Sequence, residues 1–482
     1  MAQSSIKDLP SGSWIHLMGI CGTAMASLAG LLKDRGFQVS GSDSNPYPPM
    51  STQIENLGIK ILKPYSKENL SPRPDFVVVG NVISAGNEEA QEMNRLGIKY
   101  CSLPQAMGDV IIDRCLSYVV AGTHGKTTTT SMLSWVAECC GQQPGFLIGG
   151  IAKNFSQSFK NPSGSVFVIE GDEYDTAYFD KVPKFIHYKP QRVILTSVEF
   201  DHADIYADFS AVKSAFIKLM ELIPQNGVLT YWGDNSDVSE VADRCQAEKK
   251  YSYGFNSNNS FRVEINEENA EGTDFSIFFR SQKIGQFKSA LSGRYNVLNA
   301  TAVVAQSYLS DWSMQKITEA LESFQGVKRR QDVLGLFDGV TIIEDFAHHP
   351  TAVRETVQAI QDKYIGRKVY SVFEPRSATS RRKVFQKDYR EAFSQSQEII
   401  LAEAFDQGKI SEESRFSSAE LAEDLRRIGR KAQVFSDVGA IVDYLLKQTV
   451  SGDVILIMSN GGFDGIYEKL IQGLKLRGLN RS

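Results

Sequence analysis

The chain of 482 residues has no apolar run close to the roughly 20 residues that a membrane-spanning helix needs. Its six cysteines form no Cys-x-x-Cys pair, so neither a disulfide framework nor a zinc ribbon is indicated. There is no basic excess, because the net charge is −5 and a nucleic-acid-binding face needs surplus Lys and Arg. The opening residues MAQSSIKDLPSGSW lack the basic segment and apolar stretch of a signal peptide. We therefore expect a cytoplasmic protein with no nucleic-acid or membrane partner.

At this length the chain is too long for a single hydrophobic core. Short apolar runs alternate with helical patterns over the first hundred residues, as in SWIHLMGI, GTAMASLAGLLKDRG and FQVSGSD. This βαβ alternation predicts a parallel sheet, and it resumes at LSYVVAG and near DGVTIIEDFAHHP. Hairpin-like stretches fill about 225–292. We expect three α/β domains over residues 1–114, 115–327 and 328–482.

The segment VVAGTHGKTTTT, residues 119–130, predicts a phosphate-binding loop between a buried strand and a helix. The common form of this loop is G-x-x-x-x-G-K-[ST]. Here Gly125-Lys126-Thr127 is intact, but the first glycine has moved to Gly122. In such a loop the lysine reaches the β and γ phosphates and the Thr hydroxyl binds Mg²⁺. The alternative is an ordinary strand–helix turn that contains Gly-Lys-Thr.

Two acidic segments, VIEGDEYD and VEFDHADIY, follow apolar runs of the same domain. Ligands collect at strand ends in open α/β sheets, and carboxylates suit Mg²⁺. Either segment alone is more often a solvated loop, whereas both together suggest two metal ions. The candidate residues are Asp172, Glu173, Asp175, Glu199, Asp201, His202 and Asp204.

Four further patterns have both a functional and an ordinary interpretation. Asn296 and Asn299 share one helix face and can bind an adenine edge, or they are a cap and a solvated side chain. The segment GVKRRQD places Arg330 where it can bind a transferring phosphoryl group, or where it is a solvated hinge. Asp345 and His348 would lie on one side of a helical turn. The adjacent pair His348-His349 before Pro350 is either a site or a helix start.

The N-terminal segment GICGTAM resembles the dinucleotide fingerprint G-x-G-x-x-G, but Cys21 and Ala24 replace its second and third glycines. The loop can still hold a pyrophosphate, and Asp43 at the end of the next predicted strand is placed for the same ligand. A nicotinamide dehydrogenase or a non-catalytic P-loop switch would each leave part of these motifs unused.

A Rossmann-like first domain followed in order by AGTHGKTTTT, DEYD, EFDHADIY, GRYNVLNATA, GVKRR and DFAHHPT resembles the ATP-dependent Mur ligases. The resemblance covers essentially the whole chain. It implies a Rossmann-like N-terminal domain that binds a UDP-sugar, a central P-loop ATPase domain, and a Rossmann-like C-terminal domain that binds the acceptor.

The resemblance also implies residue roles. ATP would contact the loop and its surroundings at Gly122, Thr123, His124, Gly125, Lys126, Thr127, Thr128, Asn296, Asn299, Arg330 and Asp345. The UDP-sugar would lie along Gly19, Ile20, Cys21, Gly22, Thr23, Met25 and Asp43. Mg²⁺, as two ions, would bind Thr127, Glu173 and His202. Catalysis would depend on Lys126, Glu173, His202 and Arg330, and the acceptor peptide would lie near His348, His349, Arg376 and Ser377.

Within the family the finer resemblance is to ligases that join UDP-N-acetylmuramate to the murein tripeptide L-Ala-γ-D-Glu-meso-diaminopimelate, a step of peptidoglycan recycling. The alternative is the ligase that adds free L-alanine, in which arginines of the third domain hold the amino acid's carboxylate. Here the segment FEPRSATSRRK has Ser377 and Ser380 where those arginines are expected, which favours a peptide acceptor. Some relatives carry a carbamylated lysine after the histidine motif, but the spacing of Lys213 leaves it unassigned. A monomer or weak homodimer is expected.

Overall fold

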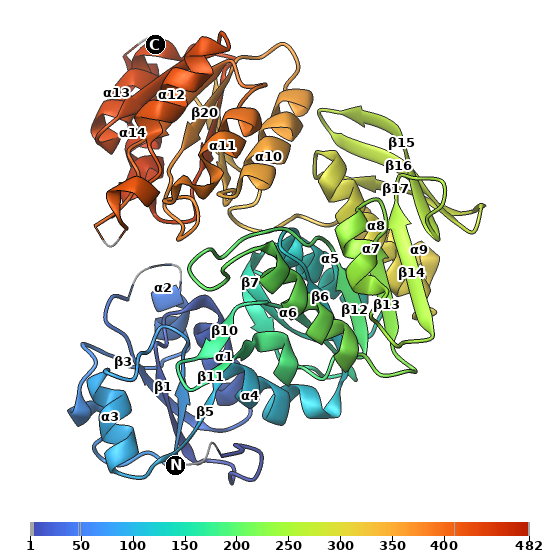
Figure 1. The fold of residues 1–482 in the computed structure, drawn as a ribbon, viewed down its shortest axis with the longest axis vertical. Coiled ribbons are helices and arrows are strands. Elements are labelled where there is room, and N and C mark those ends of the chain that lie inside the picture. The colour runs from blue at the N-terminus through green and yellow to red at the C-terminus, as the bar shows by residue number, and fades with distance from the viewer. Residues whose placement is uncertain (1–3, 47, 49, 409, 481–482) are drawn as a thin grey trace.

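The computed structural model describes residues 4–46, 48, 50–408 and 410–480. These residues form three main β-sheets that follow one another along the chain, each covered by helices. Figure 1 shows the N-terminal unit in blue at the bottom, the central unit in cyan to yellow, and the C-terminal unit in orange and red at the top. The predicted three-domain α/β architecture is confirmed.

The described residues of the N-terminal unit form a five-stranded parallel sheet in the order β3-β2-β1-β4-β5. The strand order reverses beside β1, so the loop that follows β1 opens where ligands bind in open α/β sheets. The apolar runs and the helical segment predicted here appear as strands and as α1. The elements are β1 (Trp14–Met18), α1 (Thr23–Asp34), β2 (Gln38–Ser42), α2 (Met50–Asn56), β3 (Ile61–Leu62), β4 (Phe76–Val79), α3 (Glu88–Arg95), β5 (Lys99–Ser102) and α4 (Leu103–Ala106).

The central unit is built on a ten-stranded sheet of described residues, in the order β17-β16-β15-β14-β13-β12-β6-β9-β7-β8. The predicted hairpin stretch supplies β15, β16 and β17, which pair antiparallel at one edge. The strands are β6 (Leu116–Ala121), β7 (Gly145–Ala152), β8 (Gln157–Lys160), β9 (Val166–Gly171), β12 (Arg192–Leu195), β13 (Val228–Trp232), β14 (Lys249–Gly254), β15 (Phe261–Asn269), β16 (Gly272–Phe279) and β17 (Gln282–Ser289), with a separate hairpin of β10 (Asp175–Ala177) and β11 (Asp180–Pro183). The helices are α5 (Lys126–Cys139), α6 (Phe209–Leu222), α7 (Ser236–Ala242), α8 (Arg294–Tyr308) and α9 (Met314–Glu322).

The C-terminal unit has a six-stranded sheet among its described residues, in the order β18-β19-β23-β20-β21-β22, parallel except for β18. Its strands are β18 (Asp332–Phe337), β19 (Val340–Asp345), β20 (Val369–Phe373), β21 (Glu398–Ala402), β22 (Lys431–Phe435) and β23 (Val454–Met458). Its helices are α10 (Pro350–Lys363), α11 (Gln386–Ala392), α12 (Ser418–Arg427), α13 (Val438–Gln448) and α14 (Ile466–Leu479).

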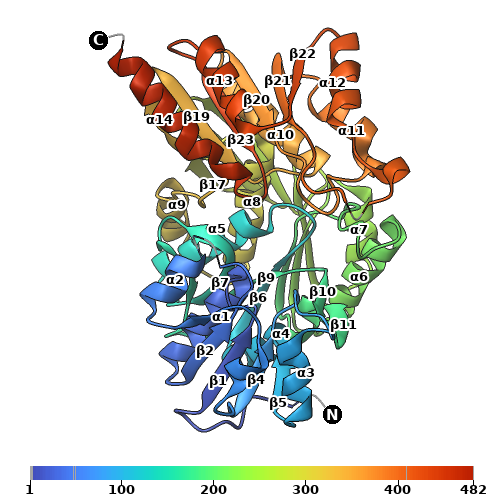
Figure 2. The same cartoon turned by 90° about the vertical axis from the view of Figure 1, so that its left-hand side faces the viewer.

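The three units are joined in two different ways. The N-terminal and central units share one apolar core, in which a Cβ added at Gly30 of α1 would meet the ring of Phe159 of β8 at 2.0 Å. Figure 2 shows α1 beside β7 at this junction. Among the described residues, the apolar cores of the C-terminal unit are built from that unit alone. Its contacts with the central unit near the site described below include hydrogen bonds such as Thr351 Oγ1 to Glu199 and Thr379 Oγ1 to Asp201.

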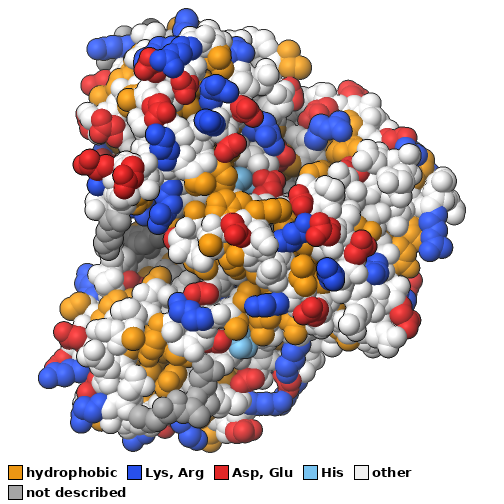
Figure 3. Space-filling model, in the orientation of Figure 1, with side chains coloured by type: hydrophobic (Ala, Val, Ile, Leu, Met, Phe, Trp, Pro, Cys, Tyr) orange, Lys and Arg blue, Asp and Glu red, His pale blue; other side chains and the backbone are white. Residues whose placement is uncertain are grey.

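On the face shown in Figure 3, Lys and Arg side chains are interspersed with Asp and Glu. Among the helices described, none has the length and apolar character needed to cross a bilayer.

Candidate active site

A cavity of about 540 Å³ lies where the three units meet. The chain after β1, including the start of α1, contributes Gly22, Thr23 and Met25, and the chain after β6, including the start of α5, contributes residues 123–128. The C-terminal unit closes the cavity with residues 345–349 and 377–379. Sequence motifs from all three predicted domains therefore converge on one space.

The phosphate-binding loop depends on glycine at two positions. Gly122 has φ +134°, and a Cβ there would come within 2.2 Å of Thr196 Oγ1. Gly125 has φ +81°, and a Cβ there would come within 2.7 Å of Asn299 Oδ1. The free backbone N–H groups at the start of a helix point outward from its end and can bind an anion there. The displaced first glycine thus belongs to a loop held tightly by its neighbours.

Ser197 and Glu199, which follow β12, hydrogen-bond to the phosphate-binding loop. β12 ends at Leu195, and from Ser197 onward the chain bonds to the loop. The backbone N–H of His124 donates to Ser197 Oγ at 2.8 Å, and that of Thr123 donates to Ser197 O at 3.1 Å. In return, the N–H of Glu199 donates to Thr123 Oγ1 at 2.8 Å.

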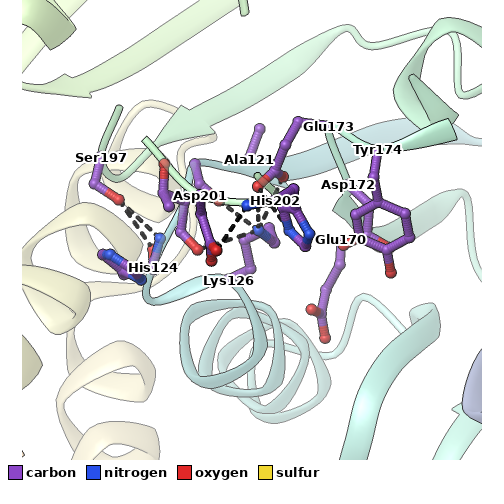
Figure 4. Close-up of polar contacts among 12 residues, drawn as sticks. Ala121, His124, Lys126, Glu170, Asp172, Glu173, Tyr174, Ser197, Asp201 and His202 are labelled. Atoms are coloured by element: carbon purple, nitrogen blue, oxygen red, sulfur yellow. Dashed lines mark hydrogen bonds and ion pairs between the residues drawn. The ribbon is translucent and has the colours of Figure 1, made fainter. Parts of the chain in front are cut away.

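Lys126, Glu173 and His202 come together beside the loop (Figure 4). Lys126 Nζ lies 3.0 Å from Glu173 Oε2 and donates to the carbonyl of Gly122 at 2.6 Å. His202 Nε2 lies 3.6 Å from Glu173 Oε1. Burial would lower the pKa of the Lys126 ammonium, but the carboxylates of Glu173 and Asp172 outweigh burial and raise that pKa. The lysine is therefore a fixed positive charge at the mouth of the loop.

The partner of Thr127 is Glu170, a residue that the sequence patterns did not single out. Thr127 Oγ1 donates to Glu170 Oε2 at 3.0 Å, and the N–H of Gly149 donates to the other carboxylate oxygen. Burial raises the pKa of Glu170. The one available signal was a charged residue ending the apolar run VFVIE. The hydroxyl of Thr127 and the buried carboxylates of Glu170 and Glu173 are oxygen donors of the kind that suits Mg²⁺, and His202 adds an imidazole beside Glu173.

A second unforeseen group is Lys184, which lines the cavity although it is 7% exposed. Its Nζ donates to Asp172 Oδ2 and to the hydroxyl of Tyr174, both at 3.0 Å. Burial opposes its charge, but Asp172 raises the pKa of the ammonium. No sequence pattern distinguishes this lysine from a surface one.

His124, Glu199 and His349 form a cluster between the central and C-terminal units. His124 Nε2 lies 3.5 Å from Glu199 Oε2, and the two imidazole rings are 4.5 Å apart. Thr351 Oγ1 donates to the same Glu199 oxygen at 2.6 Å. Burial, the larger cause, and the charge of nearby His124, the smaller one, together lower the pKa of His349 to about 3. Burial alone would raise the pKa of Glu199, but hydrogen bonding and charge from His124 lower it to about 2.

The predicted adenine and phosphate residues line the cavity, with one correction. Asn299 Nδ2 donates to Asn296 Oδ1 at 3.3 Å, and Arg330 lies over the ring of Phe346, 4.9 Å from its centroid. The expectation that Asp345 and His348 share a helical turn is wrong. Asp345 is the last residue of β19, where its carboxylate accepts from the N–H of Gln331 and of Ala347, both at 2.7 Å.

The N-terminal loop divides into residues that line the cavity and residues that support it. Gly22, Thr23 and Met25 belong to the lining. Asp43 accepts from the backbone N–H of Cys21 at 3.0 Å, so its carboxylate holds the loop. The remaining predicted residues are Gly19, whose N–H donates to Ser42 O at 2.8 Å, and Ile20, which is fully buried.

Of the four residues predicted to lie near the acceptor, three line the cavity and Arg376 does not. His348, His349 and Ser377 line the cavity. His349 is also the cap of α10, so the helix-start interpretation of the histidine pair is confirmed, and a role in binding the acceptor stays a prediction. Arg376 points elsewhere, 3.8 Å from the centroid of the Phe405 ring, with Glu374 Oε1 at 3.2 Å. Ser380 is fully buried and its Oγ accepts from Ser377 Oγ at 2.9 Å.

Lys213 lies on α6 and is directed away from the cavity. Its Nζ is 3.1 Å from Asp237 Oδ1 and also pairs with Glu240, both on α7. It is not among the residues that line the cavity in the described chain.

Three family models match the chain in order. They are the Mur ligase family catalytic domain over residues 14–114, the Mur ligase middle domain over 120–306, and the Mur ligase glutamate ligase domain over 329–461. Together they span the three units.

Individual proteins similar to this chain are also Mur ligases. The UDP-N-acetylmuramate–L-alanyl-γ-D-glutamyl-meso-2,6-diaminoheptandioate ligase of Escherichia coli K12 is 36% identical, over 95% of this chain and 98% of its own length. A murein peptide ligase structure from Psychrobacter arcticus is 32% identical with a TM-score of 0.73, covering 96% of this chain and 99% of its own. A UDP-N-acetylmuramate–alanine ligase structure from Thermotoga maritima, 21% identical with a TM-score of 0.80 over 98% of this chain and all of its own, shares the fold. The chain belongs to the Mur ligase family of ATP-dependent, amide-bond-forming ligases.

Proposed function

We propose that this protein joins the tripeptide L-Ala-γ-D-Glu-meso-diaminopimelate to UDP-N-acetylmuramate, with ATP supplying the energy. The observation that carries the proposal is the identity to relatives named for this tripeptide, 36% over 95% of the chain. Relatives named for free L-alanine are 30% identical over 98% of the chain. We place the reaction in the cytoplasm, where it recycles murein tripeptide, with the protein as a monomer or weak homodimer.

The chemistry follows from the inertness of a carboxylate toward amines. The lactyl carboxylate of UDP-N-acetylmuramate attacks the γ-phosphorus of ATP, which gives an acyl phosphate and ADP. The α-amine of the tripeptide's L-alanine then attacks the acyl carbon, forming the C–N bond. The tetrahedral intermediate loses inorganic phosphate and the amine loses a proton, so the products are the amide, ADP and phosphate.

The chain's own residues stabilise charge on the transferring phosphoryl group. Lys126, held at the loop by Gly122 O and Glu173, would contact its oxygens, and Arg330 would approach from the join of the central and C-terminal units. Thr127, Glu173 and His202 would hold Mg²⁺, in two ions, with Glu170 orienting Thr127. When bound, Mg²⁺ neutralises the charge that builds up on the phosphate oxygens.

The environment of Ser377 and Ser380 supports the proposal that the acceptor is a peptide and not free L-alanine. Ser380 is fully buried and bonded to Ser377, so an arginine side chain has no room there without displacing its neighbours. The carboxylate of free L-alanine would then lack its arginine partners. A tripeptide carries an amide at that position and does not need them.

The test is phosphate release in the presence of ATP, Mg²⁺ and UDP-N-acetylmuramate, with L-alanine or the tripeptide as acceptor. Release with the tripeptide and little with L-alanine is the expected result. Preference for L-alanine would overturn the proposed acceptor while leaving the chemistry of activation in place. Separate assays with tetra- and pentapeptides, and with lysine in place of diaminopimelate, would define the acceptor further.

A further inference from the structure

The five residues 199–203 of the central unit bridge to the C-terminal unit. Thr351 Oγ1 donates to the Glu199 carboxylate at 2.6 Å, and His349 Nε2 lies 3.0 Å from the carbonyl of Phe200. The ring of Phe200 packs 6.0 Å from that of Phe385. This short loop therefore contacts the C-terminal unit both through hydrogen bonds and through a ring contact.

One hydroxyl holds the residues on both sides of His202. Thr379 Oγ1 donates to Asp201 Oδ1 at 2.8 Å and accepts from the backbone N–H of Ala203 at 3.4 Å. The same Asp201 oxygen accepts from the backbone N–H of His202 at 2.7 Å. Thr379 and Asp201 are 4% and 7% exposed, so water competes little for these bonds.

The side chain of His202 points away from the C-terminal unit, unlike the groups of residues 201 and 203 that bond to Thr379. Its φ is +54°, a left-handed conformation that residues other than glycine adopt uncommonly and that needs support from surrounding contacts. This backbone directs its ring toward the central unit, with Nε2 3.6 Å from Glu173 Oε1 and the ring 5.0 Å from that of Tyr174. Its neighbours 201 and 203 thus bind the C-terminal unit while residue 202 faces the predicted metal site.

We propose that Thr379 is a positioning residue: its hydroxyl, supplied by the C-terminal unit, holds His202 in the orientation that completes the metal site. Docking of the acceptor-binding unit and assembly of the phosphoryl-transfer site would then occur together. The inference rests on the proposed function, because it assumes that His202 binds metal during ligation.

The experiment compares Thr379→Val, which keeps the shape and removes the hydroxyl, with Thr379→Ser, which keeps the hydroxyl. Mn²⁺ affinity is measured by electron paramagnetic resonance without turnover, in the presence of a non-hydrolysable ATP analogue and UDP-N-acetylmuramate. Groups that orient metal ligands typically change metal affinity 10- to 100-fold when removed. We expect Thr379→Val to weaken Mn²⁺ binding about 10-fold and Thr379→Ser to restore most of it. Thr318→Val on α9, whose hydroxyl donates to Met314 O at 3.0 Å, is the matched control.

Steady-state kinetics separates this role from direct contact with the acceptor. A positioning role predicts that Thr379→Val lowers kcat and raises the Mg²⁺ concentration for half-maximal rate. Unchanged Mn²⁺ affinity in a folded Thr379→Val protein, or a rise only in the KM for the tripeptide, would overturn the inference. Absence of ligation by the unmodified protein with the tripeptide, alongside altered Mn²⁺ affinity in the variant, would instead overturn the proposed function alone.

Discussion

At the scale of single residues, several groups of the site are buried or closely packed, so their side chains cannot be replaced without a clash or the loss of a contact. Glu173 is 1% exposed, and its buried carboxylate is paired with the ammonium of Lys126. Gly122 has no room for a side chain. Changes at these positions should therefore have effects larger than those of matched changes elsewhere.

Replacing Lys126 with alanine should lower the ligation rate by a factor on the order of 10²–10³, because a charged donor to the phosphoryl group is lost. Some stability should also be lost, since Glu173 keeps a buried carboxylate with one partner fewer. Phosphate release and circular dichroism would measure the two effects. Lys160→Ala, which removes a partly exposed pair with Glu138, is the control and should leave the rate unchanged. A folded Lys126→Ala enzyme with a near-normal rate would contradict the assigned role.

Gly122→Ala should destabilise the protein by about 1–3 kcal/mol and raise the KM for ATP, because the new Cβ meets Thr196 Oγ1 and Ser197 N. Gly141→Ala introduces a side chain at φ +76° with no atom within 4 Å, so it reports backbone strain without a clash. Urea denaturation and ATP titration of both variants would separate the two contributions. An unchanged KM for ATP in Gly122→Ala would show that the loop does not hold the nucleotide.

At the scale of elements, the start of α10 combines a structural and a functional task. His349 caps the helix by accepting from the N–H of Thr351, and its other ring nitrogen meets the carbonyl of Phe200. A buried imidazole with both nitrogens in use has no easy way to accept a second proton. The pH dependence of stability should reveal this arrangement.

The folded-state pKa of His349, about 3, lies below its ordinary value because burial disfavours the charged ring. The unfolded chain takes up the proton near pH 6.5 and the folded chain only near pH 3, so this residue destabilises the protein progressively as the pH falls from about 6.5 toward 3. Between pH 7.5 and 5.5 the loss should be about 1 kcal/mol. His349→Asn keeps a capping side chain without the titration and should lose correspondingly less. Urea midpoints of both proteins at the two pH values provide the test, and equal losses would contradict the prediction.

At the scale of the whole molecule, the cavity exists because three units meet. The N-terminal loop, the phosphate-binding loop and the C-terminal residues 345–349 lie in different sheets, and their common wall encloses about 540 Å³. Ligands that fill this space contact more than one unit. Binding should therefore stabilise the molecule as a whole.

A nucleotide analogue with Mg²⁺ should raise the melting temperature, with a stabilisation of about 2.7 kcal/mol at 100 times its dissociation constant. Removing Mg²⁺ with EDTA should abolish most of this increase, because the predicted metal residues belong to the nucleotide site. The effect of UDP-N-acetylmuramate should persist, because its predicted contacts lie in the N-terminal loop. Thermal melts with each ligand, with and without EDTA, make the comparison. EDTA alone is the control, and an EDTA-insensitive nucleotide effect would contradict the metal assignment.

The sequence by itself determined the kinds of element and their order. The strand before Gly122, the helix after it and the α/β alternation of the three units follow from apolar periodicity and glycine placement, which act over a few neighbouring residues. The same local signals placed the main motifs at strand ends, where the structure brings them to one cavity. Periodicity could not show that Ile20 is a core side chain or that Lys213 faces α7.

Only the tertiary structure decided which of these residues touch. Thr127 bonds to Glu170, which the sequence patterns did not single out, and Asp345 ends a strand instead of lying in the first turn of a helix. Thr379 meets Asp201 across 178 positions of the chain, at a junction between two units. Such contacts depend on how separate sheets pack against one another, which no short stretch of sequence encodes.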